Sequence, residues 1–134
     1  MIYLFAMSRR IGKIIPNGIS LEKHENNTVV FFTNLGYDIE LIPPSHIEGV
    51  HTPDFIMLKE KWEMKSLRGG KESTLEHAFK SALKQSENII LDFRGIKNYS
   101  KSLVKKSQQL FTKSKRAKKM KIIDKTGKLL EFKK

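Results

Sequence analysis

The chain has 134 residues, a mass of 15.5 kDa and no cysteine. These values suit one domain (1–134) with one modest core, and they exclude disulfides, thiolate metal sites and cysteine nucleophiles. The formal charge of +12 is uneven: residues 93–134 hold 15 Lys and Arg against 2 Asp and Glu, whereas residues 1–92 hold 11 against 12. Such asymmetry is typical of a polyanion-binding surface. A solvated lysine-rich helix and an anionic membrane surface are the alternatives. No window is long and apolar enough to span a bilayer, so we expect no membrane insertion.

The first half of the chain is predicted to consist mainly of strands. An apolar segment, Met1–Met7, is expected to form a first strand or helix. Four runs rich in β-branched, aromatic and other apolar residues follow, and we expect them to pair as two antiparallel hairpins. These runs are Thr28–Thr33, Gly36–Ile42, Asp54–Leu58 and Lys61–Lys65.

The second half alternates helices with strands. Ser73 and Glu76 have capping-box spacing, and an apolar stripe follows them, which predicts a helix to about Glu87. The continuous apolar run Asn88–Phe93 predicts a central strand covered on both faces. A second helix over about Ser100–Lys113 and a hairpin turning at 124–127 complete the chain. The order β-β-β-β-α-β-α-β-β predicts an α/β fold (α+β with a mixed sheet), in which helices flank the central sheet and a β-hairpin ends it.

Three charged residues of the second predicted hairpin could form a site. Side chains alternate faces along a strand, so Glu63 and Lys65 point the same way. If Lys59-Glu60 is the centre of an even-length turn, Asp54 faces Lys65 and lies diagonal to Glu63 on that face. An odd-length loop would send Glu63 and Lys65 to the other face. We expect the even turn.

Two carboxylates held close together repel each other, and a hard divalent cation relieves the repulsion. Asp54, Glu63 and the carbonyl of Met64 are therefore candidate metal ligands. A bound ion can polarise a phosphoryl oxygen and activate water, and Lys65 could orient that water or stabilise charge on the phosphate. The alternative is an ordinary exposed cross-strand pair, contributing roughly 0.2–1 kcal/mol.

The motifs "TPDF" and "WEMKS" resemble the two halves of the PD-(D/E)XK nuclease signature. More narrowly, "TPDF…WEMKS…KQSENIILDFRG", which covers Thr52–Gly95, resembles the C-terminal tRNase domain of CdiA-type contact-dependent inhibition toxins. The resemblance implies a PD-(D/E)XK-like core and a catalytic divalent metal, Mg²⁺ or Mn²⁺, with Zn²⁺ as a further option.

By this resemblance, Asp54 and Glu63 would bind the metal and Lys65 would act on the attacking water or the scissile phosphate. Gln85, near the end of the following helix, would help to orient the site. Glu40 is a candidate for a third acid. The resemblance also implies a cytoplasmic site of action, delivery into a target cell as part of a larger toxin, and an acidic immunity protein as partner.

The leading hypothesis is a metal-dependent endonuclease that cleaves structured RNA, with tRNA favoured by the resemblance alone. Basic residues after the central strand would contact the nucleic acid: Arg94, Lys97, Lys101, Lys105, Lys106 and Lys113. Three alternatives stay open. They are a DNA endonuclease or resolvase of the same superfamily, a metal-independent RNase of the barnase/EndoU/RelE-like group using His51 and His77, and a non-catalytic nucleic-acid-binding protein.

Overall fold

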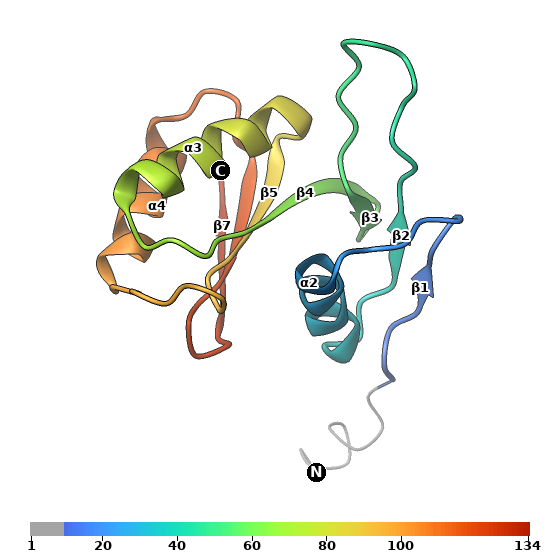
Figure 1. The fold of residues 1–134 in the computed structure, drawn as a ribbon, viewed down its shortest axis with the longest axis horizontal. Helices are drawn as coiled ribbons and strands as arrows, with labels where there is room; N and C mark the ends of the chain where they lie inside the picture. The colour runs from blue at the N-terminus through green and yellow to red at the C-terminus, as the bar shows by residue number, and fades with distance from the viewer. Residues whose placement is uncertain (1–9) are drawn as a thin grey trace.

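The computed structural model describes residues 10–134 as a seven-stranded mixed sheet with three helices (Figure 1), which confirms the predicted fold class. The strand order in the sheet follows the chain order from β1 to β7. The β1–β2, β4–β5 and β5–β6 pairs are parallel and the others are antiparallel. The strands are β1 Ile14–Ile15, β2 Ile39–Leu41, β3 Phe55–Met57, β4 Glu60–Ser66, β5 Asn88–Asp92, β6 Lys119–Ile123 and β7 Leu129–Lys133; the helices are α2 Lys23–Asn34, α3 Glu72–Gln85 and α4 Ser102–Lys113. The segment Met1–Met7 lies outside the described residues.

Two hydrophobic cores form, one on each face of the sheet. On one face, α3 and α4 pack against Ile89 and Leu91 of β5. On the other face, α2 packs in the cluster that contains Ile90 and Trp62. Every residue of β5 is buried, so the prediction of a central strand covered on both sides is confirmed.

The prediction of a strand at Thr28–Thr33 is wrong, because this run lies within α2. Its buried residues, Thr28, Val29, Phe32 and Thr33, recur with helical spacing and form one inward stripe. The helix begins with a capping box in which the side chains of Glu22 and Glu25 accept each other's backbone N–H groups.

The end of α2 is a Schellman motif. Gly36 has φ +100°, and its N–H donates to the carbonyl of Thr33, while the N–H of Tyr37 donates to the carbonyl of Phe32. The rings of Phe32 and Tyr37 pack 6.2 Å apart, which supplies the apolar contact of this motif. What looked like a turn between two strands is therefore a helix C-terminus.

The β3–β4 hairpin has the even-length turn that we expected, but the turn lies one residue earlier. Leu58 and Lys59 form it with φ values of +55° and +66°, the left-handed pair that a two-residue hairpin requires. Phe55 consequently pairs with Trp62. The predicted pairing of Asp54 with Lys65 is therefore wrong, and Asp54 is instead in line with Glu63.

The remaining elements follow the prediction closely. The apolar stripe of α3 is buried as expected, but the helix begins after Lys71 and no side chain caps it, so the predicted cap at Ser73 is wrong. The C-terminal hairpin turns at residues 124–127, where the Asp124 carboxylate accepts the N–H groups of Thr126 and Lys128. Within residues 10–134, no helix combines the length and apolar character needed to cross a membrane.

Candidate functional site

The candidate site lies where β4 changes neighbours. The first half of β4 pairs with β3 over residues 60–62, and its second half pairs with β5 over residues 63–66. The sheet divides at this point, and Figure 1 shows β4 passing from one half to the other. The edge of β4 that β3 leaves free is filled by Asp54, whose Oδ2 accepts the N–H of Met64 at 2.8 Å. The backbone N–H of Asp54 donates to the carbonyl of Trp62 at 2.9 Å.

The structure brings together Asp54, Glu63 and Lys65, as the sequence predicted. Strand alternation turns Trp62 and Met64 into the α2 core, so Glu63 and Lys65 point the other way. The Nζ atom of Lys65 lies 3.5 Å from Oε2 of Glu63. The carboxylate of Asp54 lies close enough for its charge to raise the pKa of Glu63. The alternative of a purely exposed charge pair is excluded, because the Glu63 side chain is only 7% exposed.

Burial makes this carboxyl pair electrostatically unfavourable when both groups are charged. Burial and, next, the charge of Asp54 raise the pKa of Glu63 to about 8, although Lys65 acts in the opposite direction. Burial also raises the pKa of Asp54, and the hydrogen bond from the Met64 N–H partly offsets this effect. Among the described residues, Oε1 of Glu63 has no hydrogen-bond partner although it is buried. An acceptor oxygen of this kind is expensive to bury unless a donor or a cation meets it.

These residues fit a hard divalent cation. Two neighbouring carboxylates, one with a buried unpartnered oxygen, supply the oxygen ligands that Mg²⁺ and Mn²⁺ prefer. Met64 has its side chain in the core and its N–H bound to Asp54. The role predicted for its carbonyl stays a prediction.

A third acid, Glu25, was not found from the sequence. It lies in the first turn of α2, and its charge contributes to raising the pKa of Asp54. Within residues 10–134, Glu25 also belongs to the one group of three ligand-type side chains whose atoms lie within 4.8 Å, together with Glu22 and His24. Glu40, the third acid suggested by the sequence, is exposed, and its carboxylate accepts a hydrogen bond from Asn17. The capping-box spacing of Glu22 and Glu25 was the signal that could have revealed this helix.

Gln85 is the last residue of α3, and its Oε1 is buried with no hydrogen-bond partner in residues 10–134. It lines a hollow of about 530 Å³ beside the hairpin, together with His51 and Pro53. Asp54, Glu63 and Lys65 do not line this hollow. Its orienting role stays a prediction.

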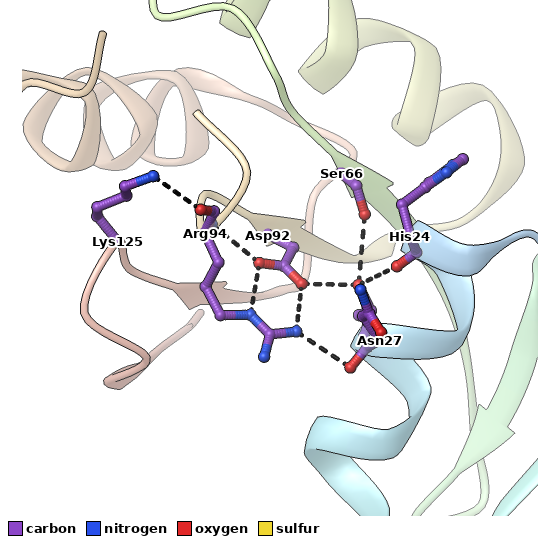
Figure 2. Close-up of polar contacts among 7 residues, drawn as sticks. His24, Asn27, Ser66, Asp92, Arg94 and Lys125 are labelled. Atoms are coloured by element: carbon purple, nitrogen blue, oxygen red, sulfur yellow. Dashed lines mark hydrogen bonds and ion pairs between the residues drawn. The ribbon is translucent and has the colours of Figure 1, made fainter. Parts of the chain in front are cut away.

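The predicted nucleic-acid-binding residues fall into two groups. Within the described chain, four are exposed and make no ion pair: Lys97, Lys101, Lys105 and Lys113. Lys106 instead pairs with Glu76 at 3.1 Å. Arg94 is not the free surface charge that the sequence suggested, because its guanidinium pairs with Asp92 (Figure 2).

Comparisons with known proteins give one family and one fold. The family model described as the contact-dependent growth inhibition CdiA C-terminal domain matches residues 51–129. Among solved structures, a chain of the CdiA-CT/CdiI toxin and immunity complex from Burkholderia pseudomallei is similar, with a TM-score of 0.69 and 18% sequence identity. The alignment covers 92% of this chain and 100% of that one, and at this identity it shows a shared fold alone. The search of curated proteins finds no match.

Proposed function

The chain belongs to the contact-dependent growth inhibition CdiA C-terminal domain family, and on that premise we propose that it is a metal-dependent endonuclease of the PD-(D/E)XK type, acting on structured RNA. The observation that carries the proposal is the meeting of Asp54, Glu63 and Lys65 where β4 changes neighbours. The burial of Glu63, and its unpartnered oxygen, favour a catalytic role over a structural one.

In this mechanism, Asp54 and Glu63 would hold the cation with help from the Met64 carbonyl, and Glu25 would add negative charge beside them. Mg²⁺ and Mn²⁺ are favoured, with Zn²⁺ as a further option. The bound ion would supply Lewis-acid chemistry, which polarises a phosphoryl oxygen and lowers the pKa of bound water. Glu63 must release its proton before it can bind the ion, because a coordinating carboxylate is ionised. Lys65, 3.5 Å from Glu63, then orients the attacking water or stabilises charge on the phosphate.

Exposed lysines on one side of the sheet support a polyanionic substrate. Lys101 precedes α4, Lys105 and Lys113 lie on it, and all three are exposed. Phosphate contacts by such residues make affinity fall steeply with salt. The favoured substrate, tRNA, rests on the motif resemblance described above.

Membership of this family also supports an immunity protein as partner and delivery into a target cell. The similar solved chain comes from a toxin and immunity complex. We propose that an acidic immunity protein neutralises this domain by covering the exposed lysines at α4, Lys101, Lys105 and Lys113. The proposed site of action is the cytoplasm of a target cell, reached as part of a larger protein.

The test is incubation with total tRNA and Mg²⁺ or Mn²⁺, with and without EDTA. We expect the intact protein to cleave only with the metal, and Lys65→Ala to reduce the rate at least about 100-fold. Lys61→Ala is the matched control, because Lys61 lies on the same strand and is exposed. Equal cleavage by wild type and Lys65→Ala would defeat the mechanism.

The same assay separates the alternatives. Cleavage of duplex DNA but not of tRNA would indicate the DNA endonuclease. Cleavage that persists in EDTA and is lost in His51→Ala would indicate the metal-independent RNase. Salt-sensitive binding without cleavage in Mg²⁺, Mn²⁺ or Zn²⁺ would indicate a binding protein.

A further inference from the structure

Arg94 is held in one position by a buried carboxylate. Its Nε and Nη2 atoms donate to the two oxygens of Asp92 at 3.0 and 2.8 Å, and Nη2 also donates to the carbonyl of Asn27 at 3.1 Å. Its guanidinium carbon lies 5.0 Å from the centre of the Phe31 ring. Figure 2 shows this network, in which the remaining nitrogen of Arg94 has no dashed line. The guanidinium is therefore positioned in advance, with one NH₂ group left to donate.

The backbone after Arg94 is fixed as well. Lys125 of the C-terminal hairpin donates from Nζ to the carbonyls of Arg94 and Ile96, at 2.9 and 2.6 Å. Asp92 is 4% exposed, and its two oxygens accept four hydrogen bonds, three from Arg94 and one from Thr28. Since that carboxylate is saturated, it has no capacity left for a cation. The Asp92 carboxylate instead fixes the orientation of the Arg94 guanidinium.

Arg94 is directed into a hollow of about 620 Å³ at the carboxyl ends of β4 and β5. The polar residues that line this hollow include His24, Asn27 and Arg68. Arg68 is exposed, and within residues 10–134 its side chain makes no ion pair or hydrogen bond. The hollow thus contains two guanidinium groups, one of them neutralised by Asp92, so its net charge is positive.

We propose that this hollow is a phosphate-binding subsite, in which Arg94 and Arg68 hold a phosphodiester group of the RNA strand. Guanidinium groups suit phosphate because their planar donors match its oxygens. The inference rests on the proposed nuclease function, since it gives this subsite the task of holding the strand beside the reacting bond.

The subsite and the candidate metal site are built from the same two elements. On α2, Glu25 lies between His24 and Asn26, which both line the hollow. On β4, Lys65 directly precedes Ser66, which lines the hollow as well. An RNA strand held in the hollow would therefore be held in position relative to the reacting groups. Contacts remote from the reacting bond raise the cleavage rate in this way.

The test measures binding separately from cleavage. In a Lys65→Ala background, which is expected not to cleave, fluorescence anisotropy gives the affinity for a 12-nucleotide single-stranded oligoribonucleotide at several salt concentrations. We expect Arg68→Ala to weaken binding at least about 5-fold and to reduce the salt slope by about 0.7, the loss of one single-strand phosphate contact. Lys80→Ala, on α3, removes an exposed lysine elsewhere and is expected to change neither value.

Arg94 is followed without mutation, because its removal would leave Asp92 buried and unpaired. The Nε–H signal of Arg94 in the NMR spectrum is expected to shift on titration with the oligoribonucleotide and to saturate at the same dissociation constant. An unmoved Arg94 signal, with Arg68→Ala binding as tightly as Lys80→Ala, would overturn the subsite.

Cleavage by protein with Lys65 intact distinguishes the two proposals. Normal tRNA cleavage together with an unmoved Arg94 signal would remove the subsite and leave the nuclease. Absence of cleavage by the intact protein, with weakened binding in Arg68→Ala, would remove the nuclease and leave an RNA-binding hollow.

Discussion

Replacing Glu63 by Gln in metal-free protein should change how stability depends on pH. The folded chain raises the pKa of Glu63 to about 8, from an ordinary value of 4.5. Its protonated form is therefore favoured by folding, and the stability present below pH 4.5 is lost as the pH rises towards about 8. Glutamine resembles the protonated acid and cannot ionise, so the variant should keep that stability.

The size of the effect follows from the shift. One pKa unit corresponds to about 1.4 kcal/mol, so the full difference is at most about 5 kcal/mol. Two neighbours modulate it: the charge of Asp54 adds to the shift and that of Lys65 reduces it. Between pH 5 and 8, the free energy of unfolding of Glu63→Gln should rise relative to wild type by up to about 1.4 kcal/mol per pH unit.

Urea unfolding in EDTA at pH 5, 6, 7 and 8 measures this difference. Glu40→Gln is the matched control, because Glu40 is also a strand glutamate but is exposed. Its free energy of unfolding should run parallel to that of wild type. A difference between Glu63→Gln and wild type that does not change with pH would refute the electrostatic description of the site.

Three further predictions follow from the site and its hairpin. Binding of Mn²⁺ at pH 7 should release about one proton, because Glu63 must ionise; calorimetry in buffers of different ionisation enthalpy measures the number, and zero would count against Glu63 as a ligand. Glu25→Gln should lower the pKa of Asp54, because it removes a charge that raises this pKa, and it should weaken Mn²⁺ binding; carboxyl NMR and calorimetry report both, and an unchanged pKa would exclude the contact. Replacing Leu58 and Lys59 by Asn and Gly should stabilise the fold by about 1–2 kcal/mol in urea unfolding, because both residues have positive φ; a loss of stability would show that their side chains contribute more than the strain costs.

The sequence predicted the elements whose periodicity and length were unambiguous. The stripe of α3 and the fully apolar β5 both lie where expected. Strand alternation also placed Glu63 and Lys65 on one face, which depends only on the pleat of β4. These features are local, so neighbouring elements did not change them.

Two predictions failed where tertiary packing outweighed local preference. Val, Phe and Thr favour strands on average, but residues 28–33 become helical because α2 buries Val29 and Phe32 against the sheet. The register of the β3–β4 hairpin differs from the predicted one because the turn at Leu58 pairs Phe55 with Trp62. Both side chains then lie in the core against α2. Neither Leu nor Lys is a usual signal for a positive φ, so no local feature of these residues indicates the turn.

The strand order in the sheet is the same as the order along the chain, and this has a consequence for how the domain can unfold under force. Within residues 10–134, each strand lies beside the strand that precedes it in the sequence, and the two outer strands, β1 and β7, are the first and the last. Traction on either end therefore reaches an outer strand first, and unravelling can proceed inward one strand at a time without drawing any segment through a loop. Refolding needs no disulfide, because the chain has no cysteine. Each strand rejoins the strand that precedes it in the sequence, and the entropy cost of closing a loop grows only slowly with its length.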